Sequence, residues 1–263
     1  MTQPRLESTE TLKVMQEQIE AKDETPDDRY HLEEYFEHKP GINADMTIDP
    51  DADDAAALAA YVIANKNFEL LGTSVTSAKA TWATTVAGIN IATDGAENDQ
   101  IIIAPHLDTN QTAWSNIKWG TENAVEWEAT LRTGGTITTE TIWAGLKLTN
   151  TPDVATDANQ IYFRYCTDDS QTKWSVVSSI ANTDVETTTP VTVAIETIYK
   201  LQIKIDANRI ARCYINDVLV YTSTALTNDI NLIPYIGIMN TDADVSASNM
   251  IVCYEKISRD LFE

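Results

Sequence analysis

The sequence has few of the residues from which metal and catalytic sites are most often built. Its 263 residues include three histidines and three cysteines, and Cys166, Cys213 and Cys253 have no CxxC spacing. Such scattered cysteines form neither a disulfide framework nor a zinc site, so we interpret them as small core residues of a protein made in a reducing cytoplasm. HExxH and GxSxG motifs are also absent, which argues against zinc-protease and serine-hydrolase chemistry.

Long apolar runs and basic residues are scarce as well. No run of about 18 apolar residues occurs, so we expect no transmembrane helix. The N-terminal stretch MTQPRLESTETLK lacks the apolar centre of a signal peptide. Lysine and arginine number 18 against 40 acidic residues, and the resulting net charge is −22. So acidic a surface repels nucleic acid and anionic membranes, and we expect neither as a partner.

The first 42 residues are predicted to form an acidic helical arm. Residues 1–54 contain 16 acidic and 5 basic side chains, and Ser8 can cap a helix that runs to about Ala21. The apolar side chains of the arm form stripes too narrow for a core, so we expect them to dock on a partner or a neighbouring subunit. These expected anchors are Leu12, Met15, Ile19, Leu32, Tyr35 and Phe36.

Residues 43–66 are predicted to hold a linker and a short alanine-rich helix. The aspartates between Asp49 and Asp54 are spaced like those of a calcium loop. Counted from Asp49, however, the turn glycine is missing and the twelfth position is Ala60. We therefore interpret the aspartates as the acidic N-terminus of a helix that ends near Asn65.

From Phe68 onward the pattern changes to short strands separated by turn signals. Threonine, valine and isoleucine dominate, and segments such as YKLQIKID alternate between apolar and polar residues. About a dozen such strands follow one another without intervening helices. This pattern predicts that residues 67–263 form a two-sheet antiparallel sandwich.

Two stretches of the sandwich region carry a family resemblance. The first begins at GAENDQIIIAPHLDTNQTAW and continues through IWAGLKLTNTPDVATDANQIYFRY; the second is YKLQIKIDANRIARCYINDVLV, followed by NLIPYIGIM and YEKISR. Over roughly residues 67–259 the chain resembles structural proteins of tailed bacteriophages that carry a concanavalin A-like, LamG-like domain. The resemblance implies an all-β jelly-roll sandwich and a place in a virion. Asn216–Asp217 stands where that family commonly has an Asn-Gly-like hairpin turn.

His106 and Asp108 stand two positions apart in DQIIIAPHLDTNQTAW, so in an extended segment both side chains would share one face. A metal site or a catalytic pair would need a third partner, but the other histidines, His31 and His38, lie in the predicted arm. We therefore interpret QIIIA as a buried strand that leaves the sheet at Pro105. We interpret His106 and Asp108 as structural residues that form neither a metal site nor a catalytic pair.

Glu126 and Glu128 match the first two positions of the acidic triplet that jelly-roll glucanases place along one strand. Retaining hydrolysis needs two carboxyl groups about 5–5.5 Å apart. The third position of the triplet is Thr130, so the set is incomplete. We interpret these residues as a solvated strand face and expect no enzymatic activity.

Six tryptophans raise the question of sugar stacking. Trp127 and Trp143 lie inside alternating strands and are expected in the core. Trp114 and Trp119 flank the loop SNIK and are the candidates for an exposed pair at a glycan-binding rim. We favour anchoring of a long loop onto the sandwich as the role of this pair and keep glycan binding as the alternative.

Two oxygen-rich loops, TDGAEND and NTPDVATDANQ, offer the hard ligands that calcium prefers. Acidic turns are common in so acidic a protein, so we expect no cofactor and keep Ca²⁺ as an alternative. The candidate ligands are Asp94, Asp99, Asp153 and Asp157.

The expected function is structural: a decoration, or cement, protein on the outer surface of a phage capsid, made in the host cytoplasm. Its expected partners are the major capsid protein and further copies of itself, in a dimer or trimer. The acidic exterior suits a position away from packaged DNA. The alternatives are a receptor- or glycan-binding module of a head or tail fibre and, third, a polysaccharide hydrolase.

Overall fold

The computed structural model describes seven ranges of the chain, and the statements below concern these residues. The predicted linker and alanine-rich helix at 43–64 lie outside them. The described ranges are 29–37, 40–42, 65–73, 75–105, 119–148, 157–242 and 247–260.

Within these ranges the chain is almost entirely β-structure, with one short 3-10 turn at Ser77–Lys79. None of the described residues forms a helix long and apolar enough to cross a bilayer. The strands are β1 (Arg29–Glu34), β2 (Pro40–Ile42), β3 (Asn65–Gly72), β4 (Ala80–Trp82), β5 (Ile89–Ala92), β6 (Gln100–Pro105), β7 (Trp119–Gly120), β8 (Glu126–Thr133), β9 (Glu140–Lys147), β10 (Gln160–Cys166), β11 (Lys173–Ile180), β12 (Thr183–Thr192), β13 (Ile198–Ile205), β14 (Ile210–Ile215), β15 (Val218–Ala225), β16 (Asn231–Asn240) and β17 (Asn249–Asp260).

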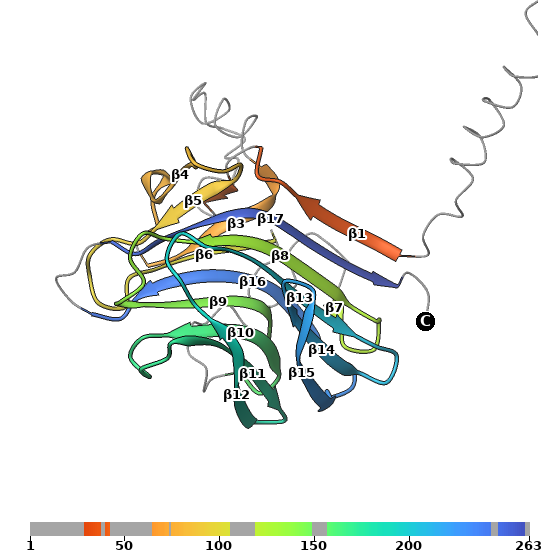
Figure 1. Ribbon diagram of the computed structural model, residues 1–263. Helices are drawn as coiled ribbons and strands as arrows, with labels where there is room; N and C mark the ends of the chain where they lie inside the picture. Colours follow the sequence, from red (N-terminus) through yellow and green to blue (C-terminus); the bar gives the residue numbers. More distant parts are fainter. Residues whose placement is uncertain are drawn as a thin grey trace, which may run out of the picture.

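The strands form two sheets that stack face to face (Figure 1). The eight-stranded sheet, here sheet I, has the order β15-β14-β13-β8-β17-β5-β4, and β1 also pairs with β17. The nine-stranded sheet, here sheet II, has the order β12-β11-β10-β9-β16-β6-β3-β2, and β7 also pairs with β16. The β2–β3 pair is parallel, whereas the ladders that build the centre of both sheets are antiparallel. The predicted antiparallel jelly-roll sandwich is thereby confirmed.

The core lies between the two sheets and follows from alternation along each strand. In β8, Trp127 and Leu131 point inward between outward polar side chains. In β9, Ile142 and Leu146 point inward from the opposite sheet and belong to the same apolar cluster. Burial of each such side chain contributes about 1.5–3 kcal/mol, so this cluster supplies the main free energy that holds the sheets together.

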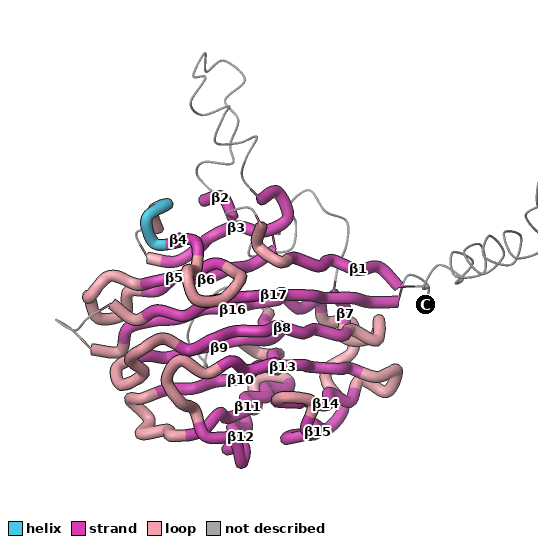
Figure 2. Tube along the Cα trace, turned by 45° about the horizontal axis from the view of Figure 1, so that its top comes forward, coloured by secondary structure: helices cyan, strands magenta, loops and turns pink. Residues whose placement is uncertain are grey.

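Residues 29–34, expected within the helical arm, form strand β1 at the side of β17 (Figure 2). The antiparallel register begins with Arg29 opposite Asp260, and the Arg29 Nη1 donates to Asp260 Oδ1 over 2.6 Å. The helical prediction is therefore wrong for this segment. The pairing with a distant strand outweighs the local propensity of RYHLEE.

Three of the six predicted anchors lie in residues 29–37, and two of them contribute to the interior of the sandwich. Leu32 packs against the main core, and Phe36 is buried with its ring centroid 5.5 Å from that of Phe68. Tyr35 remains 58% exposed, and its hydroxyl donates to Glu33. Phe36 is consequently not available to dock on a partner, and Leu32 is available only in part. The remaining anchors, Leu12, Met15 and Ile19, lie outside the described residues.

The turn between β14 and β15 has the geometry that its position in the hairpin requires. Asn216 and Asp217 have φ angles of 50° and 64°, and a type I′ turn needs positive φ at both central residues. The Lys200 backbone N–H donates to Asn216 Oδ1, and the Lys200 ammonium lies 2.9 Å from an oxygen of Asp217. These contacts hold Asp217 in a conformation that glycine adopts more easily.

Candidate binding site on the outer face of sheet II

The outer face of sheet II carries a second apolar cluster, separate from the core. Side chains alternate between the two faces of β9, so Ile142 points into the core and Trp143 points to the outer face. Tyr162 of β10 and Tyr235 of β16 lie on the same outer face. All members of this cluster come from sheet II, which places it outside the sandwich interior. They are Ile102, Ala104, Trp143, Tyr162, Val177 and Tyr235.

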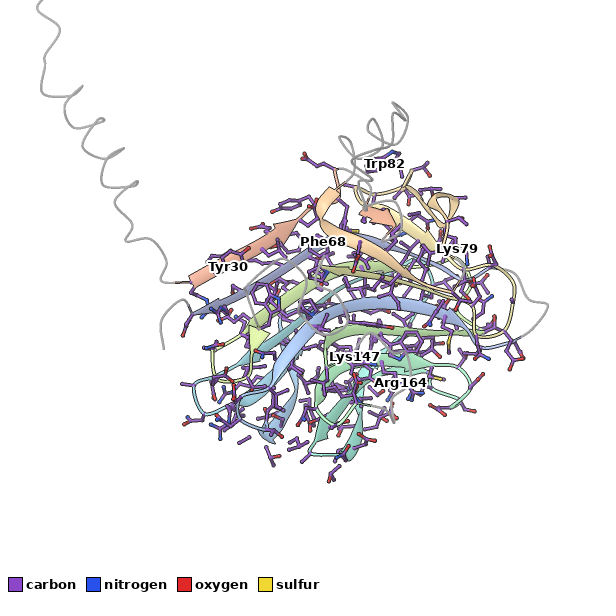
Figure 3. All side chains as sticks on the ribbon, turned by 180° about the vertical axis from the view of Figure 1, so that it is seen from behind. Tyr30, Phe68, Lys79, Trp82, Lys147 and Arg164 are labelled. Carbon is purple, nitrogen blue, oxygen red and sulfur yellow. The ribbon has the colours of Figure 1, made fainter. Side chains whose placement is uncertain are left out.

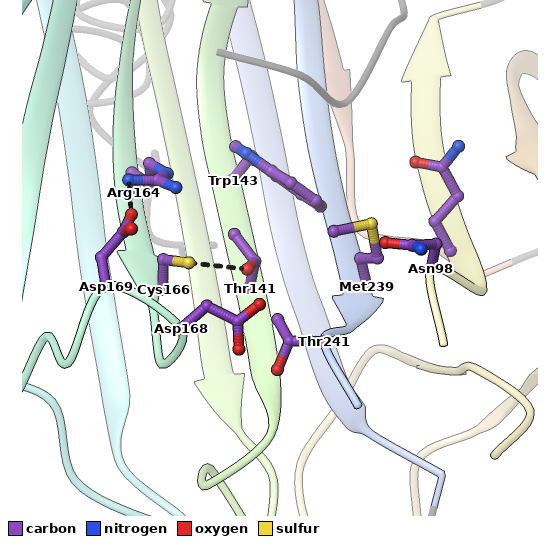
Figure 4. A pocket seen from close by; sticks show the side chains of 10 residues that line it. Asn98, Thr141, Trp143, Arg164, Cys166, Asp168, Asp169, Met239 and Thr241 are labelled. Atoms are coloured by element: carbon purple, nitrogen blue, oxygen red, sulfur yellow. Dashed lines mark hydrogen bonds and ion pairs between the residues drawn. The ribbon is translucent and has the colours of Figure 1, made fainter. Parts of the chain in front are cut away.

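A pocket of about 500 Å³ lies beside this cluster (Figure 4). It is formed at the end of sheet II where β6 and β9 begin and β10 and β16 finish, so four distant segments contribute to it. Its volume falls within the range of about 300–1,000 Å³ typical of small-molecule sites. The lining residues are Asn98, Gln100, Thr141, Trp143, Arg164, Cys166, Asp168, Asp169, Met239 and Thr241.

Arg164 is the basic side chain of the pocket lining, and acidic groups surround it. Its Nη1 lies 2.5 Å from Asp169 and 3.2 Å from Glu186. Burial alone would lower the pKa of Arg164, but the neighbouring Cys166, Glu186 and Asp169 outweigh burial and raise it. With Asp168 also on the rim, the pocket has an excess of negative charge.

Several buried polar atoms in and beside the pocket have no hydrogen-bond partner among the described residues. Trp143 Nε1, Arg164 Nε and Gln100 Oε1 belong to side chains that line the pocket. The hydroxyls of Tyr162 and Tyr235 lie in the adjacent cluster and are also unpartnered. Burial raises the pKa of both phenols, so each hydroxyl keeps its proton and can donate.

Lys147 of β9 lies on the same outer face of sheet II as Arg164 (Figure 3). Its Nζ lies 3.8 Å from Asp157, and both side chains are fully or almost fully buried. The ammonium also lies 5.4 Å from the ring centroid of Tyr162 and 5.2 Å from that of Tyr235. A buried cation beside Asp157 and two aromatic faces orients both tyrosines beside the pocket.

The predicted glycan rim at Trp114 and Trp119 does not form as expected. Trp119 is 1% exposed, because β7 pairs with β16 and places the indole in the main core, with its ring centroid 5.7 Å from that of Tyr30. The glycan-rim alternative is therefore wrong for Trp119, whereas its burial is consistent with the anchoring role. Trp114, together with His106 and Asp108, lies outside the described residues.

The other two tryptophans with predicted positions are both buried, but in different places. Trp127 lies between the sheets, as expected. Trp143 is 2% exposed on the outer face of sheet II and lines the pocket. Alternation along a strand predicts which residues share a face of the sheet. It does not predict which of the two faces adjoins the core.

The calcium alternative fails at Asp94 and Asp99, because a lysine occupies the space between them. The Lys79 ammonium lies 2.8 Å from both oxygens of Asp99 and 3.1 Å from Asp94, and it is almost fully buried. Asp157 pairs instead with Lys147. In the described ranges no three metal-ligating side chains cluster, and Asp153 lies outside those ranges.

Glu126 and Glu128 lie on the outer face of sheet I, on the other side of the molecule from the pocket. Glu126 is 3.7 Å from Lys204, and Glu128 is 3.6 Å from Lys200 and accepts a hydrogen bond from Gln202. The two carboxylates thus belong to a ladder of alternating charges on a solvated face, as their spacing indicated.

Sequence reasoning missed Arg164, Asp168, Thr141 and Gln100 as pocket residues. A signal was present in the residue types at the outward positions of β10, which are Tyr162, Arg164 and Cys166. The outward positions of β8 carry glutamate, threonine and arginine, as a solvated face requires. A comparison of the outward residues of β8 and β10 would have shown that the outer face of sheet II differs from a solvated face.

The fold places the protein among the concanavalin A-like jelly-roll sandwiches. The family model described as "SO2946-like, C-terminal domain" matches residues 122–238, which hold β8 to β15, most of β16 and most of the pocket. No curated protein matches the sequence.

Solved structures share the sandwich at low sequence identity. A protein of unknown function, SO2946 from Shewanella oneidensis MR-1, superposes with a TM-score of 0.54 and 10% identity, over 100% of this chain and 99% of that one. The carbohydrate recognition domain of Emp47p gives a TM-score of 0.52 and 7% identity, over 74% of this chain and 90% of that one. Identities this low establish a common fold and nothing further.

Proposed function

We propose that this protein is a carbohydrate-binding module whose site is the outer-face pocket of sheet II. The pocket itself is the observation that carries the proposal. Its lining combines the aromatic Trp143 with side chains that hydrogen-bond to hydroxyl groups, among them Asn98, Thr141 and Asp168. An apolar surface with a few convergent polar groups is the arrangement of a small-molecule site, and sugars present both hydroxyls and apolar ring faces.

The fold gives this proposal secondary support. The domain of Emp47p that shares the sandwich is named for carbohydrate recognition. A shared fold does not establish that two proteins bind the same ligand, so the assignment rests on the pocket of this chain.

The proposed module binds its ligand without cleaving it. Glycoside hydrolysis uses two carboxyl groups, one on each side of the scissile bond. Asp169 in the pocket is held by Arg164, and Glu126 and Glu128 lie on the other sheet. Among the described lining residues this leaves Asp168 as the carboxylate without an ion pair, which suits the binding of hydroxyls.

Binding to an immobilised glycan library, followed by calorimetry on the ligands found, tests the proposal. Asp168→Asn should weaken binding by about tenfold or more, because an exposed carboxylate that accepts hydrogen bonds from hydroxyls is lost. Glu126→Gln makes the same chemical change on the opposite sheet and should leave binding unchanged. No binding to any glycan, or equal effects of the two substitutions, would refute the assignment.

Decoration of a phage capsid is a second candidate function. The observation that favours it is the net charge of −22, with 16 acidic and 5 basic side chains in residues 1–54. In that role residues 1–28 would attach to the major capsid protein, the sandwich would be displayed outward as a dimer or trimer, and the pocket would contact host sugars.

Deletion of residues 1–28 tests the decoration role, because it ends before β1 and leaves every described residue in place. The truncated protein should keep the sandwich and its glycan binding, while its incorporation into particles should be lost. A longer deletion, of residues 1–42, would also remove β1 and the buried Phe36, so it would not test residues 1–28 alone. Undiminished incorporation of the shorter deletion would count against this role.

A further inference from the structure

Three hydrogen-bonding atoms of the pocket lining have no partner among the described residues. Trp143 Nε1 and Arg164 Nε are donors, Gln100 Oε1 is an acceptor, and all three are buried and unpartnered in the described part of the chain. Buried polar atoms in native proteins are nearly always paired, and each unpaired one costs stability. Three such atoms in one pocket indicate that the ligand supplies the missing partners.

A fourth unpartnered atom lies just behind the pocket wall. The Tyr235 hydroxyl is fully buried, and Gly237 makes room for its ring: a Cβ at position 237 would lie 3.1 Å from Tyr235 Cε1 and 3.3 Å from the hydroxyl oxygen. The ring centroid of Tyr235 is 6.4 Å from that of Trp143. Met239 both lines the pocket and packs against this aromatic cluster, so one flexible side chain adjoins both.

The negative charges around the pocket determine which kind of hydrogen-bond acceptor a ligand can bring to the donors of the pocket wall. A carboxylate or sulfate on the ligand would meet Asp168, Asp169 and the nearby Glu186, and Arg164 is already engaged by two of them. The net charge of −22 adds to this repulsion. The acceptor that suits Trp143 Nε1 is therefore a neutral oxygen, such as that of a carbonyl group.

A carbonyl acceptor for the donors and an N–H donor for Gln100 together make a secondary amide. We infer that the pocket recognises an acetamido group, and hence that its ligands are N-acetylated sugars; this rests on the proposed function. The carbonyl oxygen takes the Trp143 N–H, the amide N–H is directed to Gln100 Oε1, and the methyl group contacts Met239. Asp168 on the rim accepts hydrogen bonds from sugar hydroxyls.

Calorimetry with three oligosaccharides of equal length tests this inference: tri-N-acetylchitotriose, cellotriose and trigalacturonate. The acetylated trimer should bind at least about tenfold more tightly than cellotriose, because a site built for a hydrogen-bonding group rejects an analogue that lacks it. Trigalacturonate should bind least, owing to its three carboxylates. Gln100→Leu should reduce the preference for the acetylated trimer, because the amide N–H loses its acceptor.

Tyr235→Phe adds a readout that a merely structural tyrosine would not give. Because its hydroxyl is unpartnered, the substitution should leave thermal stability unchanged or higher, and because the hydroxyl lies behind the pocket wall, it should leave binding of the acetylated trimer unchanged. Tyr165→Phe is the matched control, since the Tyr165 hydroxyl donates to the Ile137 carbonyl over 2.9 Å. That variant should melt at a lower temperature and bind sugar as the wild type does.

The outcomes separate the inference from the proposed function. If cellotriose binds as tightly as the acetylated trimer, and Asp168→Asn weakens both, the acetamido inference is wrong and the carbohydrate site stands. If Tyr235→Phe destabilises the protein as much as Tyr165→Phe does, the hydroxyl has a partner and the inference also fails. If no sugar of the glycan library binds at all, both proposals fall.

Discussion

The outer faces of the two sheets differ in chemistry although both are built from alternating antiparallel strands. On sheet I, Glu128 lies between Lys200 and Gln202 in a ladder that faces solvent. On sheet II, Trp143 and Tyr235 are buried and bear hydrogen-bonding atoms that no described residue satisfies. The first face is solvated, whereas the second leaves buried polar atoms unsatisfied at a cost in stability, and we propose that ligand binding offsets this cost.

Two lysine–carboxylate pairs of nearly equal length make the same point. Lys204 lies 3.7 Å from Glu126 with both side chains about half exposed, and Lys147 lies 3.8 Å from Asp157 with both side chains buried. Water screens the exposed pair, so it contributes little to stability. The buried pair has lost its hydration, so removal of either partner strands a charge.

Substitution of these lysines gives the largest expected difference between the two faces. Lys147→Ala should lower the free energy of unfolding by about 3–5 kcal/mol, because Asp157 is left buried without its counter-charge. Lys204→Ala should lower it by less than about 1 kcal/mol. Urea denaturation measures both values, and similar losses in the two variants would show that the faces do not differ in this way.

A buried glutamate of sheet I extends the contrast to pH dependence. Burial raises the pKa of Glu255 to about 8, although the hydrogen bond that Trp127 Nε1 donates to it acts in the opposite direction. The unfolded chain has a value near 4.5, so the folded state holds the proton more tightly. The stability that this protonated carboxyl contributes is complete below pH 4.5 and is lost as the pH rises towards 8.

Glu255→Gln should therefore gain stability relative to the wild type as the pH rises, by about 1.4 kcal/mol between pH 6 and pH 7. Glu140 has a pKa raised by burial to about 8 as well, so part of the wild-type pH dependence should persist in the variant. Urea midpoints at pH 5, 6, 7 and 8 measure the slopes, and parallel slopes for Glu255→Gln would contradict the assignment.

The smallest expected effect concerns the hairpin turn at the edge of sheet I. Asp217→Gly should stabilise the protein by a few tenths to about 1 kcal/mol, because glycine adopts the φ of 64° without steric cost. The exposed ion pair with Lys200 is lost at the same time, at little cost. Asp217→Ala loses the same pair without the conformational gain, so thermal melts should rank it below Asp217→Gly.

The sandwich could be predicted because its signal is local. The alternation in YKLQIKID became β13 (Ile198–Ile205), and the apolar run QIIIA became β6 (Gln100–Pro105), in which Pro105 still pairs with Phe68 of β3. Each strand carries its own two-residue period, so no knowledge of its neighbours is needed.

Strand β1 and the pocket could not be predicted, because both depend on pairing between distant segments. The three- and four-residue spacing of Leu32, Tyr35 and Phe36 favours a helix, and only the ladder to β17 makes the segment extended. The pocket joins Gln100, Thr141, Arg164 and Met239, which the registers of β9 with β10 and β16, and of β16 with β6, bring to one end of sheet II. No short pattern in the sequence encodes those registers.

The position of β17 near the end of the sequence affects how the protein folds during its synthesis. It pairs with β8, β5 and β1, so sheet I is divided into separate pieces until residues 249–260 exist. On the ribosome, β8 must wait for its neighbour while the intervening residues are made, on the order of ten seconds at ordinary synthesis rates. During that interval the apolar sides of β8 and β5 are without their final cover, so a nascent chain halted before β17 should be the form that chaperones hold and proteases remove.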